Sequence, residues 1–277
     1  MARNGPEMTE IISSASNQLV KRVRALGDRR RRQREGAFVV EGIQPVWRAV
    51  AAGWPIETLL VAPDLLRESA ASAMVAEQEA RGVRVARLSK ELFQRLSDRD
   101  SPPGLAAIVR GRTSELKTLE VTPGAVFAVL HEVGNPGNLG TIIRTVDAVG
   151  GAGVILVGDC TDPFAPAAVK ASMGSLFAVD VAHVRTADGF FDWVREHGVQ
   201  VVTTSGRADD EHWSTEYRTP IAILLGSEGD GLPEDLIDRG DHCVRIPMVG
   251  TAESLNLAVA AGVLLYEARR HLVGSAE

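Results

Sequence analysis

The chain has 277 residues, 45% of them hydrophobic and 24% charged, and its formal net charge is −6 at pH 7. These values are typical of a globular protein, and because no apolar run reaches about 20 residues, we expect no membrane contact. The two cysteines, Cys160 and Cys243, lie far apart without a second ligand at metal-binding spacing, so neither a metal site nor a disulfide framework is predicted.

Residues 1–15 are polar and lack the apolar core of a secretory signal. We therefore expect a mobile N-terminus on a cytoplasmic protein. From residue 16 to 112 the pattern predicts a small α/β domain. Its helices are expected at 17–35, 44–52, 65–80 and 90–96, and its strands at 37–41, 56–62, 83–86 and 105–109.

The first predicted helix is strongly basic although the whole chain is acidic. Between residues 20 and 36 the charge is about +6, which favours binding to RNA phosphates, because arginine outnumbers lysine and its planar fork suits phosphate. A solvated helix face or a mobile basic arm would have the same composition. The candidate RNA-binding residues are Lys21, Arg22, Arg24, Arg29, Arg30, Arg31, Arg32 and Arg34.

A polar segment at 113–123 with few apolar anchors is predicted to be a linker. Beyond it, residues 124–277 form the second predicted domain, in which apolar strands are separated by helices. This order is typical of a largely parallel sheet covered on both faces. Strands are expected at 125–130, 153–157, 199–203, 221–225 and 243–246, with helices at 139–149, 165–173, 189–196, 234–238 and 254–272.

Three glycine-rich segments of this second domain each lie near a predicted junction between a strand and a helix, at 135–144, 225–232 and 246–256. One such segment would be an ordinary turn, but three suggest loops that converge on one ligand. Gly134, Gly137 and Gly140 have the spacing GxxGxxG, which differs from the GxGxxG of dinucleotide-binding folds. A nucleotide-dependent oxidoreductase is therefore disfavoured.

Each polar residue in these segments also has a purely structural interpretation. Asn138 could cap a helix and Arg144, six residues later on its second turn, could be a surface charge. The segment around Glu228 could be a turn. Ser254 could be an N-cap, with Asn256 a satisfied polar residue in the first turn.

Taken together, however, the three segments resemble the signature motifs of the SpoU (TrmH-like) class of RNA methyltransferases in the SPOUT superfamily. The motif N-x-G-x-x-x-R is matched by Asn138, Gly140 and Arg144, the motif G-S-E-G-x-G-L by 226–232, and the motif I-P-M…S-L-N by 246–248 and 254–256. Segment 170–175 is similar to the family's S-x-G element. The first half resembles the substrate-binding domain of such enzymes through 38–42 and 101–107, with Pro103 in place of a glutamine.

The resemblance implies a knotted methyltransferase domain that binds S-adenosylmethionine, forms a homodimer through the C-terminal domain, and methylates a ribose 2′-hydroxyl of RNA, with ribosomal RNA favoured. A methyltransferase of tRNA and a non-catalytic knotted RNA-binding protein are the alternatives. The implied catalytic residues are Arg144, Asn138, Glu228, Ser254 and Asn256. The implied cofactor-binding residues are Gly226, Ser227, Ile246, Met248, Leu255 and Asn256.

Arg144 is also a candidate RNA-binding residue. We expect it to position a phosphate rather than act as a general base, because a guanidinium does not lose its proton near neutral pH.

Overall fold

The computed structural model describes residues 11–67 and 69–274, and the chain divides into two compact units that meet between Arg112 and Thr113. The predicted mobile N-terminus lies mostly among residues 1–10, outside the described residues. Ile12, by contrast, forms a parallel bridge with Leu88, through backbone hydrogen bonds to Arg87 and Ser89.

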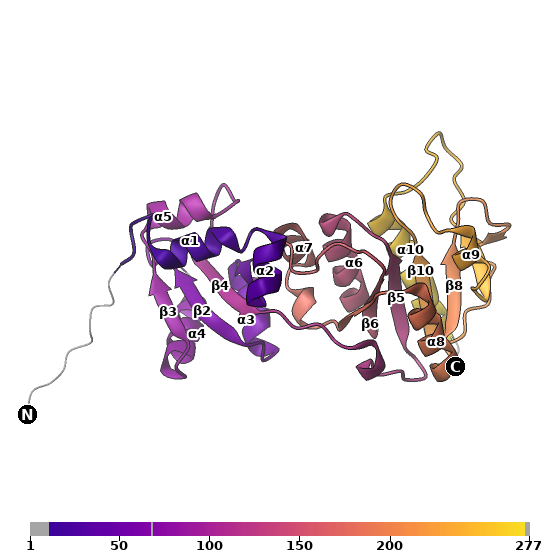
Figure 1. Cartoon of the computed structure of the whole chain (residues 1–277), viewed down its shortest axis with the longest axis horizontal. Coiled ribbons are helices and arrows are strands. Elements are labelled where there is room, and N and C mark those ends of the chain that lie inside the picture. The colour runs from indigo at the N-terminus through magenta and orange to yellow at the C-terminus, as the bar shows by residue number, and fades with distance from the viewer. Residues whose placement is uncertain (1–10, 68, 275–277) are drawn as a thin grey trace, which may run out of the picture. The chain divides into compact units, whose positions relative to one another are not determined.

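The first unit is a four-stranded sheet with helices on both faces. Its strand order is β1-β4-β2-β3, and only the pair β2–β3 is parallel. Helices α1 and α5 lie together on one face (Figure 1), where Leu19, Phe93 and Ile108 share a core. The strands are β1 (Ala37–Glu41), β2 (Ile56–Val61), β3 (Arg84–Arg87) and β4 (Leu105–Arg110). The helices are α1 (Gln18–Ala25), α2 (Arg29–Glu35), α3 (Ile43–Ala51), α4 (Ser69–Ala80) and α5 (Lys90–Leu96).

The single helix predicted over 17–35 is wrong, because the chain breaks between α1 and α2. The side chain of Asp28 accepts a hydrogen bond from Arg31 N at 3.0 Å and so caps α2. The carbonyls of Leu26 and Gly27 at the end of α1 are satisfied by the buried guanidinium of Arg32, at 3.0 and 2.7 Å. An arginine predicted to bind RNA therefore stabilises the helix break instead.

The second unit confirms the predicted largely parallel sheet. Seven strands follow the order β7-β6-β5-β10-β8-β11-β9, and every neighbouring pair is parallel. The strands are β5 (Val126–His131), β6 (Gly153–Val157), β7 (Val181–Val184), β8 (Gln200–Thr204), β9 (Asp210–Glu211), β10 (Ile221–Leu225) and β11 (His242–Arg245). The two edge strands, β7 and β9, were not predicted, and β9 has only two residues, too few for a periodic signal.

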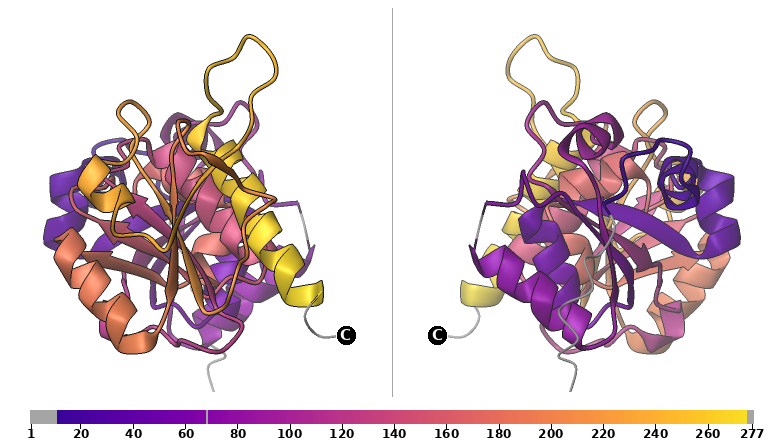
Figure 2. Two further views of the ribbon diagram at one scale, coloured as in Figure 1. Left: turned by 90° about the vertical axis from the view of Figure 1, so that its right-hand side faces the viewer. Right: turned by 90° about the vertical axis from the view of Figure 1, so that its left-hand side faces the viewer.

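Helices cover both faces of this sheet. Figure 2 shows α8 and α10 on opposite sides, and α6 and α7 pack on the same side as α10. The helices are α6 (Pro136–Ala148), α7 (Pro166–Ser172), α8 (Ala187–His197), α9 (Glu234–Ile237) and α10 (Leu257–Gly274), with 3-10 turns η1 (Leu116–Thr118) and η2 (Ser175–Phe177). Within the described ranges no helix has the length and apolar character needed to cross a membrane.

The segment predicted as a linker packs on the second unit. Ser114 N donates a hydrogen bond to Val181 O at 3.0 Å, and the Ser114 hydroxyl donates to Asp180 at 2.6 Å. Leu119 is 5% exposed and belongs to the core beneath α8. Two apolar residues at helical spacing, Leu116 and Leu119, anchor a stretch whose overall composition is polar.

Helices α6 and α7 approach each other closely at Gly140. A methyl group there would overlap the carbonyl oxygen of Ala168 and would lie 2.8 Å from the Ala171 side chain. We predict that Gly140→Ala destabilises the protein by about 3 kcal/mol, because the obstacle is backbone and cannot rotate away. Gly124→Ala is the matched control, since open space surrounds Gly124. Urea unfolding of both variants measures the difference, and equal stabilities would contradict the close packing.

Candidate functional site

All three glycine-rich segments leave the same edge of the second sheet. The first follows β5, the second follows the neighbouring strand β10, and the third follows β11. Because these strands are parallel, their carboxyl ends meet at one edge, which is where ligands bind in open α/β sheets. The predicted convergence of the segments is thus a consequence of the sheet topology.

The carboxylate of Glu228, in the second segment, accepts hydrogen bonds from the first. Its Oε2 accepts from Gly134 N at 3.3 Å, and its Oε1 accepts from Asn135 N at 3.2 Å and from Asn138 Nδ2 at 2.9 Å. These bonds join residues about 90 positions apart in the chain. Glu228 therefore holds the loop after β10 against the start of α6.

The third segment joins through Asn256. Its Nδ2 donates to Asn138 Oδ1 at 3.0 Å, while its Oδ1 accepts from Ala258 N at 2.9 Å. Asn256 is therefore the N-cap of α10, and the interpretation of Ser254 as the cap is wrong, because the helix begins at Leu257. We call the three linked side chains Glu228, Asn138 and Asn256 the polar network.

Asn138 is free to join this network because another residue caps α6. The side chain of Asn135 accepts from Gly137 N at 2.8 Å and from Asn138 N at 3.2 Å. The interpretation of Asn138 as a cap is thus wrong. Asn135 was not predicted as a site residue, although an asparagine followed by a proline at the first helical position is a recognisable helix start.

The loop after β10 closes on itself. Ser227 and Gly231 exchange backbone hydrogen bonds at 3.2 Å, and the Ser227 hydroxyl accepts from Asp230 N at 3.3 Å. A methyl group at Gly226 would overlap the backbone of Gly231 and Leu232. Glycine is therefore required at position 226, at the base of this narrow loop, because the backbone of Gly231 and Leu232 occupies the space that a side chain would need.

Glu228 is an exposed carboxylate that nevertheless has a lowered pKa. Partial burial by itself would raise the pKa, but hydrogen bonds from the Asn138 side chain and from backbone N–H groups stabilise the charged form and outweigh it. The site therefore carries a fixed negative charge at neutral pH, open to solvent on one side.

The structure leaves other predicted site residues outside the polar network. Arg144 is exposed and has no ion-pair or hydrogen-bond partner among the described residues. It lies on the third turn of α6, not the second, because the helix starts at Pro136. Ser254 and Met248 are exposed in the loop before α10, and Ile246 and Leu255 are half-buried there.

The basic segment divides into two groups. Arg22 pairs with Glu35 at 2.7 Å and with Glu57 at 2.6 Å, and Arg31 also pairs with Glu35. With Arg32 at the helix break, these arginines of the basic segment have structural partners within the first unit. The exposed side chains are those of Lys21, Arg24, Arg29, Arg30 and Arg34.

No group of three or more His, Cys, Asp or Glu side chains among the described residues is arranged to hold a metal ion. Cys160 is buried and its thiol donates to Leu130 O and Val157 O. Burial raises the pKa of this thiol, so it is a poor nucleophile. The functional groups that the structure brings together at the sheet edge are the amides of Asn138 and Asn256 and the carboxylate of Glu228.

Comparison with known proteins gives matches over both units. Residues 125–266 match the model of the SpoU rRNA Methylase family, and residues 17–107 match the MRM3-like substrate binding domain. The chain is 33% identical to the 23S rRNA (uridine(2479)-2′-O)-methyltransferase of Streptomyces viridochromogenes, over 99% of this chain and 97% of that protein. It is 28% identical to the 23S rRNA (guanosine(2553)-2′-O)-methyltransferase RlmP of Bacillus subtilis, over 93% and 98%.

A solved structure extends the likeness to three dimensions. The AdoMet-bound rRNA methyltransferase from Sinorhizobium meliloti aligns with a TM-score of 0.87 and 38% identity, covering 95% of this chain and 98% of that one. Since the alignment covers 95% of this chain, it includes residues of both units.

We predict that Glu228→Gln lowers stability at pH 7 by about 1 kcal/mol, a value reduced for solvent exposure. The amide nitrogen would face the backbone N–H of Gly134 or Asn135, so one acceptor is lost. Because the pKa of Glu228 is lowered by folding, its contribution is present above the ordinary value and is lost as the pH falls below about 4.3. Urea unfolding at pH 7 and at a pH below about 4.3 should therefore show that the wild type is more stable than Glu228→Gln only at pH 7. The same difference in stability at both pH values would contradict the role that we give to the Glu228 carboxylate.

Proposed function

We propose that this chain, which belongs to the SpoU rRNA methylase family, transfers a methyl group from S-adenosylmethionine to a ribose 2′-hydroxyl of ribosomal RNA. The observation that carries the proposal is the polar network, in which Glu228, Asn138 and Asn256 join all three motif segments at the carboxyl edge of the sheet. The matched relatives named 23S rRNA 2′-O-methyltransferases support the substrate and the reaction.

The cofactor site would be formed by the second and third segments. The loop that Gly226 closes so tightly has no room for a side chain at its base, whereas a side chain at Gly229 or Gly231 would meet open space. Such a loop suits a ligand held by backbone groups. We assign Gly226, Ser227, Ile246, Met248, Leu255 and Asn256 to this site, within a trefoil knot as in the family. When bound, S-adenosylmethionine supplies a methyl group already activated by its sulfonium.

Arg144 is the residue we assign to the RNA. It projects from α6 about 120° around the helix axis from Asn138, exposed and without an acidic partner among the described residues. An unpaired guanidinium at a helix surface is suited to a phosphate, which it contacts through two parallel hydrogen bonds. The 2′-hydroxyl proton would pass to water or to a phosphate oxygen, since the guanidinium already holds all its protons.

The functional form would be a homodimer, and Ser254 and Met248, exposed in each chain, would complete the site near the partner. The supporting observation is an apolar stripe on α10 formed by Val259, Val263 and Tyr266, of which Val259 is 53% and Tyr266 57% exposed. These positions share one helix face. Light scattering tests the proposal, and the mass of a single chain would contradict it.

Ribosomal RNA as substrate implies that the protein works in the cytoplasm.

The reaction is tested with labelled S-adenosylmethionine and purified large-subunit, small-subunit and transfer RNA. We expect label in large-subunit RNA at one nucleotide, which then resists alkaline cleavage because its 2′-oxygen is blocked. Label in tRNA alone would favour the tRNA alternative. If the chain binds RNA but transfers no methyl group to any of the three, it is a non-catalytic RNA-binding protein and the proposal fails.

We predict that Arg144→Ala and Arg144→Lys each lower kcat by about 100-fold or more while leaving the Kd for S-adenosylmethionine unchanged. Lysine keeps the charge but loses the planar fork, so it should not rescue the reaction. Arg195→Ala is the control, because Arg195 is an exposed arginine on α8, on the opposite face of the sheet. Near-normal turnover of Arg144→Lys would exclude a specific role for the guanidinium.

A further inference from the structure

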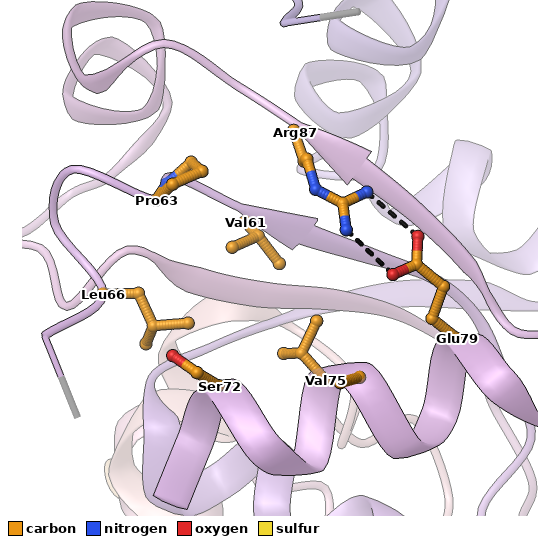
Figure 3. Close-up of a pocket in the computed structure, with 8 residues that line it drawn as sticks. Val61, Pro63, Leu66, Ser72, Val75, Glu79 and Arg87 are labelled. Carbon is orange, nitrogen blue, oxygen red and sulfur yellow. Dashed lines mark hydrogen bonds and ion pairs between the residues drawn. The ribbon is translucent and has the colours of Figure 1, made fainter. Parts of the chain in front are cut away.

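The first unit contains a pocket of about 210 Å³ that the polar network does not use. It lies between α4 and the carboxyl ends of the parallel strands β2 and β3 (Figure 3). Val61, Leu66 and Val75 are buried side chains that form its apolar floor, and Pro63, Ser72 and Ala76 are exposed at its rim. The pocket is therefore open to solvent above and closed by packed hydrocarbon below.

An ion pair between Arg87 and Glu79 forms one end of the pocket. Arg87 donates through both terminal nitrogens to Glu79, at 2.9 and 2.8 Å, so the guanidinium plane is fixed by two parallel hydrogen bonds. The Arg87 side chain is 27% exposed and that of Glu79 41%. Figure 3 shows this pair beside the apolar side chains rather than behind them.

This pairing determines the charge of a suitable ligand. An unpaired arginine in a pocket attracts phosphate, but here a carboxylate already occupies the fork and the pair has no net charge. A second anion would be repelled by Glu79. The remaining features are a flat cationic face, apolar walls, and carboxylate lone pairs able to accept further N–H donors. A neutral, flat ligand with polar edges fits all three.

We propose that this pocket holds one unpaired nucleobase of the RNA substrate, stacked against the paired Arg87 guanidinium above the apolar floor. The inference rests on the proposed function, because the unit that contains the pocket matches a substrate binding domain over residues 17–107. Proteins that recognise RNA commonly accept splayed-out bases on arginine planes and in apolar pockets. Donors on the base edge would be read by Glu79.

The test fills the pocket without disturbing the core. Ala76 is exposed on α4 and lines the pocket, whereas Ala73 is exposed on the same helix and does not line it. Ala76→Leu should weaken binding of purified large-subunit RNA about tenfold, the usual loss for one stacked base. Ala73→Leu should bind like the wild type. For Ala76→Leu we expect a raised KM for RNA with unchanged kcat and unchanged Kd for S-adenosylmethionine.

A second pair of variants tests the paired arginine. Arg87→Gln removes the stacking plane, and Arg81→Gln breaks the exposed pair between Arg81, which directly follows α4, and Glu77 of α4, outside the pocket. Only the first should weaken RNA binding. If Ala76→Leu and Arg87→Gln both stay within about twofold of their controls, the pocket holds no base and the inference is overturned.

The occupant is identified with a short RNA that contains the methylated nucleotide, made with single abasic sites at its unpaired positions. One abasic site should weaken binding to the wild type about tenfold and leave binding to Ala76→Leu unchanged. An equal effect on both proteins at every position would contradict the proposal. RNA binding is measured without the cofactor, so these outcomes are distinct from a failure of methyl transfer.

Discussion

The architecture of the site depends on the hydrogen bonds that the Glu228 carboxylate accepts. Two backbone N–H groups and the Asn138 amide converge on it, and Asn138 in turn binds Asn256. The bonded side chains are 90 and 118 positions apart in sequence. Two of the segments also have hydrogen bonds of their own, but the bonds of Glu228 and Asn256 are what link the three segments to one another. The three segments therefore form one cooperative unit rather than three independent turns.

The direction of these hydrogen bonds follows from a single backbone group. Ala258 N can only donate, so Asn256 must turn its carbonyl oxygen toward it and its Nδ2 toward Asn138. Asn138 then presents its oxygen to Asn256 and its Nδ2 to Glu228. Glu228 is left facing only donors, which is consistent with its lowered pKa. The start of α10 thus orients the Asn138 amide so that its Nδ2 donates to Glu228.

Sequence reasoning predicted those parts of the fold that local patterns determine. The strands at 37–41, 153–157 and 221–225 and the helix at 90–96 have the predicted bounds. Apolar runs and helical periodicity identify such elements. The break between α1 and α2 was missed, because it depends on where the Arg32 guanidinium finds its acceptors. Charge counts cannot distinguish that arginine from its neighbours.

The candidate site shows the same division between local and long-range information. The motifs identified Asn138, Glu228 and Asn256, but that they bond to one another is a property of the sheet order and could not be read from spacing. The capping assignments were wrong for the same reason: composition allowed several caps, and only the true helix starts at Pro136 and Leu257 select Asn135 and Asn256. Residue types and spacing therefore identify the candidate site and capping residues, but only the tertiary structure shows which hydrogen bonds each of them makes.

The distribution of positive charge limits what phosphate binding can achieve in this protein. Glu35 and Glu57 neutralise part of the basic segment, and Arg32 is buried, so the cationic surface is smaller than the sequence suggests. Contacts to phosphate in any case position RNA without reading its sequence. Choosing one ribose among thousands requires contact with bases or with a particular RNA shape. In the first unit, the neutral pocket beside Arg87 and Glu79 combines a stacking surface with hydrogen-bond acceptors, which phosphate-binding arginines alone do not provide.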